Sequence, residues 1–332
     1  MAPPRVAVTG ALSYTGRYLT RLLLDEGASV VNLSGRARPI AAHNLPAQDV
    51  ARVEARPLAF SEPARLERAL RGCDVLYCTY WIRFAVGGDT HAAAAERCRT
   101  LFEAAAKAGV QKVVFSSHTR AAEDSPFAYI AGKASAVGAL RKLSASSGMG
   151  YAVVRPCGIF GDTADESVLM NNAAWVLRRV PLFLLAGGGQ HRFQPVHVRD
   201  MAELMADLGH RSPHTSGEER DACGPDAPTA RELFRSIARA CGSRALVVPS
   251  GLSTGVITAL SRPINWATGD VLLDGDDLDL LCSGLTLADE PEDPAIARRR
   301  SLLGWLAEVG PSLGAAYVSS MARYYSVSAG GS

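Results

Sequence analysis

Residues 5–27 read RVAVTGALSYTGRYLTRLLLDEG, and the order of elements that they predict indicates the fold class. An apolar strand ends at Thr9, a turn bounded by Gly10 and Gly16 follows, and an amphipathic helix comes next. The backbone amides of such a turn and the positive end of the helix dipole converge on one point, where an anion is stabilised. The order of strand, glycine turn and helix predicts a site for the pyrophosphate of a dinucleotide.

The turn departs from the usual three-glycine pattern at its middle position, where Ser13 stands. Serine is small enough for a phosphate to approach closely. Its hydroxyl either donates to that phosphate or serves only the local turn. The residues that we expect to hold the dinucleotide here are Gly10, Ser13, Tyr14, Thr15 and Gly16.

Short apolar runs alternate with longer amphipathic ones from this stretch as far as Pro156. The alternation is typical of repeated βαβ units, so we predict an α/β fold with a Rossmann domain, a doubly wound parallel sheet, over residues 1–156. Residues 157–330 are expected to form a smaller, mostly helical substrate lobe, with strand and helix returns to the Rossmann sheet. The helices expected after Pro156 cover residues 199–208, 229–241, 298–308 and 312–325.

Composition and cysteine spacing exclude several classes of protein. A net charge of +2 over 332 residues is too small to indicate nucleic-acid binding. The seven cysteines have neither a CxxC pair nor a zinc-type spacing, so no disulfide framework and no metal site is indicated. The start of the chain lacks the pattern of a signal peptide, and no run of about eighteen apolar residues follows. We expect a cytoplasmic monomer or homodimer that binds a small-molecule substrate, without nucleic-acid or membrane partners.

The end of the second predicted strand bears on the choice of cofactor. An acid at this place binds both ribose hydroxyls of NAD, whereas arginine pairs with the 2′-phosphate of NADP. This chain offers Ser34, Arg36 and Arg38 and no acid. We therefore expect NADP(H) rather than NAD(H). The alternative is that the two arginines only solvate a loop.

The segment FAYIAGKASAV, residues 127–137, carries the candidate chemistry. Tyr129 and Lys133 are four residues apart and share one face of the predicted helix. Hydride transfer to a ketone leaves an oxyanion that needs a proton, and a nearby ammonium lowers the pKa of a phenol that supplies it. Tyr129 is therefore the candidate proton donor.

Several segments together resemble the short-chain dehydrogenase/reductase superfamily, in its extended or atypical branch. They are TGALSYTGRYLTRLLLDEG at 9–27, GCDVLYCTYW at 72–81, YIAGK at 129–133, RPCGIFG at 155–161 and FQPVHVRDMAEL at 193–204. The resemblance extends over nearly the whole chain. It is nearest to a group described as NAD(P)-binding and NAD-dependent epimerase/dehydratase-like, related to the complex I accessory subunit.

The resemblance implies roles for further residues. It implies that Lys133 also bonds the nicotinamide ribose and that Pro156 belongs to the cofactor-side turn after strand six. Cys78 and Thr79 close the fourth strand and are expected beside that ribose, unless they serve only packing. Ala59 stands where relatives often carry an acid that contacts adenine.

One position departs from the pattern at the reaction centre. Relatives usually carry serine or threonine two residues beyond Ser116 to polarise the carbonyl, and this chain has His118. Our hypothesis is that His118 replaces the hydroxyl donor, since an imidazole donates or accepts protons near neutral pH. The alternative is a surface histidine beside a site built on Ser117.

Bulky side chains indicate the class of substrate. If several of them line the cofactor cleft, the substrate is hydrophobic and aromatic or polycyclic. They are Tyr80, Trp81, Phe84, Phe160, Trp175, Phe183, Phe193 and Trp266. Asn171 or Asn172 is expected either to contact that substrate or to be structural.

Three functions remain open at this point. The favoured one is an NADPH-dependent reductase of a ketone on a hydrophobic, aromatic or polyketide-type molecule of secondary-metabolite biosynthesis, with Tyr129 as proton donor. The second is a nucleotide-sugar epimerase or dehydratase that retains its NAD(P). The third is a non-catalytic NAD(P)-binding scaffold or regulator.

Overall fold

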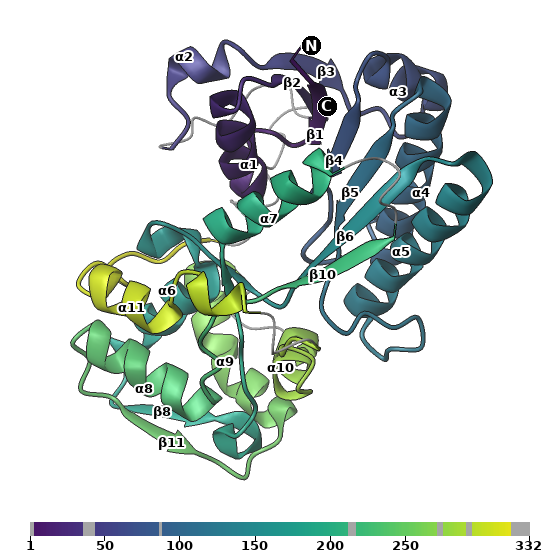
Figure 1. Cartoon of the computed structure of the whole chain (residues 1–332). Coiled ribbons are helices and arrows are strands. Elements are labelled where there is room, and N and C mark those ends of the chain that lie inside the picture. Colours follow the sequence, from purple (N-terminus) through teal and green to yellow (C-terminus); the bar gives the residue numbers. More distant parts are fainter. Residues whose placement is uncertain are drawn as a thin grey trace, which may run out of the picture. The chain divides into compact units, whose positions relative to one another are not determined.

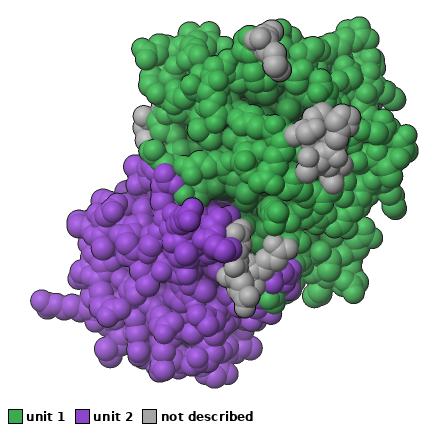
Figure 2. All heavy atoms as spheres, in the orientation of Figure 1, with its two compact units in different colours: residues 1–156, 198–222 green, residues 157–197, 223–332 purple. Residues whose placement is uncertain are grey.

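The computed structural model describes residues 3–35, 44–85, 88–211, 217–270, 275–289 and 294–319. The chain divides into two compact units, coloured separately in Figure 2. Unit 1 holds residues 1–156 and 198–222, and unit 2 holds residues 157–197 and 223–332. The chain therefore leaves unit 1 after Pro156, returns to it for one helix and one strand, and leaves it again.

Unit 1 is built on a parallel sheet. Within the described residues it has seven strands, in the order β10-β6-β5-β4-β1-β2-β3. The strands are β1 (Arg5–Thr9), β2 (Ser29–Ser34), β3 (Glu54–Pro57), β4 (Val75–Cys78), β5 (Lys112–Ser116), β6 (Gly150–Pro156) and β10 (Glu218–Ala222). The predicted Rossmann α/β class is confirmed.

Helices cover both faces of this sheet (Figure 1). On one face lie α3 (Pro63–Leu70), α4 (His91–Ala108) and α5 (Ala128–Ser147), and on the other α1 (Tyr14–Asp25) and α7 (Val198–His210). The short helix α2 (Ala47–Val50) lies between β2 and β3 in the chain. The inner strands are apolar on both faces because both faces are covered, and Ala7, Leu76 and Val113 are fully buried.

Among its described residues, unit 2 is mostly helical, with two small parallel strand pairs. Its helices are α6 (Val168–Leu177), α8 (Ala230–Ala240), α9 (Thr254–Thr268), α10 (Gly275–Cys282) and α11 (Leu302–Val309), with the 3-10 turns η1 (Ala164–Glu166), η2 (Ala186–Gly189) and η3 (Ile296–Arg298). The pairs join β7 (Ile159–Phe160) to β9 (Val196–His197) and β8 (Leu182–Leu185) to β11 (Leu246–Pro249). Its core gathers Phe160, Leu233 and Trp305.

The sequence placed some elements of the second half wrongly. The predicted helix at 312–325 is wrong for residues 312–319, which form turns, bends and irregular backbone, and residues 320–325 lie outside the described part. Gly314 has a φ of +73° and a β-carbon there would lie 2.4 Å from the backbone of α6, which excludes a continuing helix. Among the described residues, no helix has the length and apolarity to cross a membrane.

Candidate cofactor and catalytic site

The predicted site residues gather at one edge of the unit 1 sheet. Strand order reverses at β1, which pairs with β2 on one side and β4 on the other. Ligands of open α/β sheets bind at the carboxyl ends of the strands beside such a reversal. Gly10, Ser34, Cys78 and Pro156 lie at the carboxyl ends of β1, β2, β4 and β6, and Ser117 follows β5.

The glycine turn has the geometry that a phosphate site needs. Gly10 has a φ of +61°, and a β-carbon on Gly16 would lie 2.0 Å from the carbonyl oxygen of Gly10. Only glycine therefore allows α1 to start this close to β1. Ser13 is the N-cap residue but its side chain caps no amide, so the first-turn amides of Thr15 and Gly16 can serve a ligand. The turn fits a dinucleotide pyrophosphate.

A buried asparagine fixes this turn, and the sequence analysis missed it. The side-chain Oδ1 of Asn32 accepts a hydrogen bond of 2.9 Å from the backbone amide of Ala11. Asn32 is buried within the apolar strand β2. The signal was present, because a polar residue inside an apolar strand needs a specific partner. Asn32 therefore takes one amide of the turn, which leaves the helical amides to the ligand.

The end of β4 is bonded to the end of β1. The hydroxyl oxygen of Thr9 accepts hydrogen bonds from the amides of Thr79 (2.8 Å) and Tyr80 (2.9 Å), and the Thr79 hydroxyl donates to the Thr9 carbonyl (2.7 Å). Cys78 is fully buried. The structure thus supports the packing alternative for Cys78, and it gives the Thr79 hydroxyl a structural partner.

Tyr129 lies among three aromatic rings of unit 1. Its ring centroid is 6.1 Å from that of Trp81, 5.4 Å from that of His91 and 5.8 Å from that of His118, each in an edge-to-face arrangement. Gly132 permits this approach of α5, because a β-carbon there would lie 3.0 Å from the His91 carbonyl oxygen. His91 was not predicted as a neighbour of Tyr129, and nothing in the sequence near it indicates that role.

Lys133 is buried next to this cluster. Its ammonium donates a hydrogen bond of 2.6 Å to the carbonyl oxygen of Ser116 and lies 4.3 Å from the centroid of the Trp81 ring. Burial lowers the pKa of Lys133 to about 8. The ammonium is therefore charged at neutral pH, and it is held at the end of β5 on the same helix as Tyr129.

The geometry of His118 changes the role expected for it. Its Nδ1 lies 2.7 Å from the carbonyl oxygen of Thr119, and burial lowers its pKa to about 4. A carbonyl oxygen only accepts, so Nδ1 carries the proton and Nε2 of the neutral ring is an acceptor. This arrangement does not support His118 as a donor to a carbonyl. The imidazole is also buried, which excludes the surface alternative.

Ser117 is the neighbouring hydroxyl at the end of β5. Its amide donates to the Val154 carbonyl oxygen (2.8 Å), while its buried Oγ has no hydrogen-bond partner among the described residues. A buried hydroxyl without a partner is unusual and costs stability. Ser117 is therefore the hydroxyl of this edge that a ligand could satisfy.

The predicted cofactor residues Arg36 and Arg38 lie outside the described residues.

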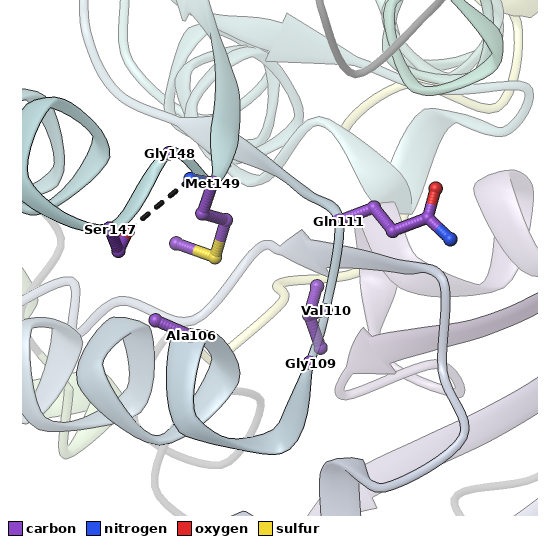
Figure 3. A pocket seen from close by; sticks show the side chains of 7 residues that line it. All are labelled: Ala106, Gly109, Val110, Gln111, Ser147, Gly148 and Met149. Atoms are coloured by element: carbon purple, nitrogen blue, oxygen red, sulfur yellow. Dashed lines mark hydrogen bonds between the residues drawn. The ribbon is translucent and has the colours of Figure 1, made fainter.

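Figure 3 shows a cavity of unit 1 that is separate from the candidate site. The cavity, of about 430 Å³, lies where α4 and α5 lead into β5 and β6, at the amino ends of those strands. Its lining residues, which include Gln111 and Met149, offer no titratable side chain. The cavity is thus at the sheet edge opposite the candidate site.

Most of the bulky residues of unit 2 have structural roles. Phe160 is buried against Trp305, and Phe183 stacks on Phe234 of α8. The side chains of Asn171 and Asn172 bond the backbone of residues 314–318. Their structural alternative therefore holds, and these residues do not by themselves support an aromatic substrate pocket.

A model of the NAD dependent epimerase/dehydratase family matches residues 6–214. The chain belongs to this family. The match begins with the glycine turn and includes every site residue described above, and the cofactor of the family is a nicotinamide dinucleotide. The resemblance drawn from the sequence motifs is thereby confirmed.

One curated protein resembles the chain over part of its length. This relative, from Dictyostelium discoideum, is "NADH dehydrogenase [ubiquinone] 1 alpha subcomplex subunit 9, mitochondrial", with 28% identity over 69% of this chain. The match spans 62% of that relative, which is less than two thirds of its length.

Two solved structures share the fold of the chain. Citrobacter sp. triphenylmethane reductase complexed with NADP(H) is 15% identical, with a TM-score of 0.69 over 92% of this chain and 99% of that one. An NADPH-dependent quinone oxidoreductase from Escherichia coli, complexed with NADPH, is 20% identical, with a TM-score of 0.68 over 93% of this chain and 99% of that one. At these identities the likeness establishes the fold alone.

Proposed function

We propose that the protein is an NADPH-dependent reductase of a carbonyl group on a hydrophobic small molecule. The observation that carries the proposal is the placement of Tyr129 and Lys133. Both lie on α5, and the Lys133 ammonium is bonded to the end of β5, at the edge where the glycine turn lies. A phenol and an ammonium at the cofactor edge are the groups that carbonyl reduction needs.

The residues of the chain position and supply the proton of the reduction. When bound, the reduced nicotinamide supplies a hydride to the carbonyl carbon. The carbonyl π electrons move to oxygen, and the Tyr129 hydroxyl gives its proton to that oxygen, so that an alcohol forms. The Lys133 ammonium stabilises the phenolate left on Tyr129 and bonds the nicotinamide ribose. The Ser117 hydroxyl donates to the carbonyl oxygen and so polarises it.

The choice of NADPH over NADH rests on the loop after β2. Arg36 and Arg38 supply the charge for a 2′-phosphate, and Ser34 supplies a hydroxyl at the end of the strand. The names of two structurally similar proteins support this choice, because both are bound to the phosphorylated cofactor. We therefore propose NADP(H) as the physiological cofactor.

The class of substrate follows from the same neighbours and from the aromatic cluster at Tyr129. The similar reductases are named for a triphenylmethane dye and a quinone, both conjugated ring systems. Trp81 and Tyr129 make an edge-to-face aromatic contact at this edge, and aromatic side chains favour aromatic ligands. A quinone or an aromatic, polyketide-type ketone is thus the proposed substrate, and the cytoplasm the proposed compartment.

A second function is favoured by the curated relative. That protein is named as a mitochondrial subunit of NADH dehydrogenase. By this likeness the chain would be a dinucleotide-binding subunit or regulator without turnover, and its compartment would follow its partner complex. Tight NADPH binding without consumption of NADPH by any carbonyl compound would favour this function.

The test measures NADPH oxidation with a panel of quinones and aromatic ketones. We expect turnover with at least one of them, and a fall in kcat of at least about a hundredfold in Tyr129→Phe, because general acid catalysis contributes that much. The affinity for NADPH, measured by fluorescence titration, is expected to be unchanged. Ser117→Ala should lower kcat in the same direction.

Tyr151→Phe is the matched control for Tyr129→Phe. Tyr151 lies near the start of β6, at the opposite edge of the sheet, so its loss should leave kcat unchanged. Undiminished turnover in Tyr129→Phe would remove the assigned acid. Tighter binding of NADH than of NADPH would contradict the role of the arginines.

A further inference from the structure

Exposed apolar side chains are concentrated on one part of unit 2. Of the eight large apolar side chains that are exposed among the described residues, seven lie in segments 182–185 and 246–266. The eighth is Leu303 of α11, and none belongs to unit 1. Single exposed apolar residues are ordinary, but a concentration of this kind marks a surface that binds another protein, a membrane or a ligand.

The first part of this surface is the outer face of the β8–β11 pair. Phe183 faces inward onto Phe234 of α8, and Figure 1 shows α8 along one side of the two strands. Leu182 and Leu246 are paired across the strands on the other face, where they are 47% and 67% exposed. Val248 is exposed on that same face. Parallel strands are normally covered on both faces, and here only one is covered by described residues.

The second part is helix α9, which follows β11 directly. None of its side chains that the structure describes is buried. Val256 and Leu260 are one turn apart and exposed, and Trp266 is 88% exposed. Both α9 and β11 contact η2, the turn after β8, so the helix and the strand pair are joined at that turn.

Within β8, β11 and α9 themselves, the charged side chains have a single sign, whereas helix α10, which contacts α9, carries three aspartates. Residues 242–269 contain Arg244 and Arg262, both exposed, and no aspartate or glutamate. Residues 167–197, which include β8, likewise contain arginines and no acid. Phospholipid headgroups with negative charge complement these arginines, and the apolar side chains then enter the interface.

We propose that the face formed by β8, β11 and α9 docks on the surface of a bilayer that contains anionic lipid. Trp266 would lie at headgroup level, where tryptophan is favoured, with Leu260 and Val256 in the acyl boundary. The α9 helix is too short to span a bilayer, which takes about 20 residues, so the contact is one of surface docking. The proposal replaces the expectation that no membrane takes part. It does not depend on the proposed reductase activity.

The test uses the full chain and two kinds of vesicle, pure phosphatidylcholine and phosphatidylcholine mixed with phosphatidylglycerol. We expect cosedimentation with the mixed vesicles, weakening as salt is added, and little with the neutral ones. Arg262→Glu should weaken the binding at least about fivefold, since each cation near an anionic surface contributes about that factor. Leu260→Glu should abolish the binding. Binding to the mixed vesicles is also expected to shift the tryptophan fluorescence emission of the protein. Loss of this shift in Trp266→Phe would place Trp266 in the interface.

Leu303→Glu is the matched control, because it puts the same charge on an exposed leucine outside the surface. It should bind the mixed vesicles as the unmodified protein does. Equal binding by Leu260→Glu, or no binding to mixed vesicles, would overturn the proposal. If light scattering shows that the unmodified protein is a dimer and that Leu260→Glu is a monomer, the surface would be assigned to a second copy of the chain. If the protein neither binds the mixed vesicles nor forms such a dimer, a protein partner would remain as the occupant of this surface. That result would also overturn the proposal.

Discussion

The side chain of His118 shows how one buried proton sets the chemistry of the candidate site. Its Nδ1–H is fixed by the Thr119 carbonyl oxygen, and its ring lies edge-to-face with Tyr129. Because the ring stays neutral, the only cation assigned to this group is the Lys133 ammonium. Burial is the main cause of the lowered pKa of His118, and repulsion by the Lys133 ammonium lowers it further. Under the proposed function, the proton needed for reduction would then come from the phenol of Tyr129.

The lowered pKa of His118 predicts a pH dependence of stability. In the unfolded chain the imidazole binds a proton near pH 6.5, and in the folded protein only near pH 4. Between these values the unfolded state holds more protons, so stability is fully present above pH 6.5 and is lost as the pH falls toward 4. The loss from this one group is up to about 3 kcal/mol.

His118→Asn isolates this contribution. The asparagine amide can still donate to the Thr119 carbonyl oxygen but does not titrate. We expect the free energy of unfolding, measured by urea titration at a series of pH values, to fall less steeply in the variant between pH 6.5 and 4. Parallel curves for the two proteins would show that His118 titrates normally.

At the scale of elements, the carboxyl ends of β1 and β4 are joined through the Thr9 side chain. Thr9→Val preserves the shape of the side chain but leaves the amides of Thr79 and Tyr80 without an acceptor. A fully buried unsatisfied amide costs about 1–3 kcal/mol. Because Thr79 and Tyr80 are half-buried, we expect a loss of roughly 2–4 kcal/mol of unfolding free energy for the two amides together. Chemical denaturation measures this loss.

Thr9→Ser keeps the hydroxyl oxygen and serves as the control for Thr9→Val. It removes one methyl group and should cost about 1 kcal/mol or less. If the two variants lost equal stability, the hydroxyl would not join the strands. NADPH affinity should fall in Thr9→Val alone, because the turn after β1 is bonded to the same strand.

The elements also show why the sequence predicted only part of the fold. Strands β1, β4 and β5 are apolar on both faces and were predicted because burial on both faces leaves a clear pattern. The edge strand β10 reads EERDA, and its first three residues are not buried, so it has no such pattern. Its pairing with β6 is a long-range contact that local composition does not encode. The four-residue spacing of Tyr129 and Lys133 predicted that they share a helix. The sequence did not predict that His91, which lies on another helix, contacts Tyr129.

At the scale of the whole molecule, the chain runs through unit 1 twice. Residues 198–222 supply α7 and β10, which complete the unit begun by residues 1–156. Helix α7 buries Met201, Met205 and Leu208, and a β-carbon on its Gly209 would lie 2.0 Å from the Tyr77 hydroxyl. The sheet face beside α1 is therefore closed by a segment that arrives late in the chain.

This arrangement predicts that residues 1–156 do not fold stably alone. Without α7 the fragment would expose the apolar face over β4 and β5 that this helix contacts, and without β10 the edge of β6 would be unpaired. We expect it to show no cooperative thermal transition by circular dichroism and to be digested rapidly by protease, whereas the full chain melts cooperatively. If the fragment instead melts cooperatively with a midpoint near that of the full chain, residues 198–222 would not be needed for the stability of the unit. In that event the glycine turn would also hold NADPH in the fragment, a result that fluorescence titration can establish on the same sample.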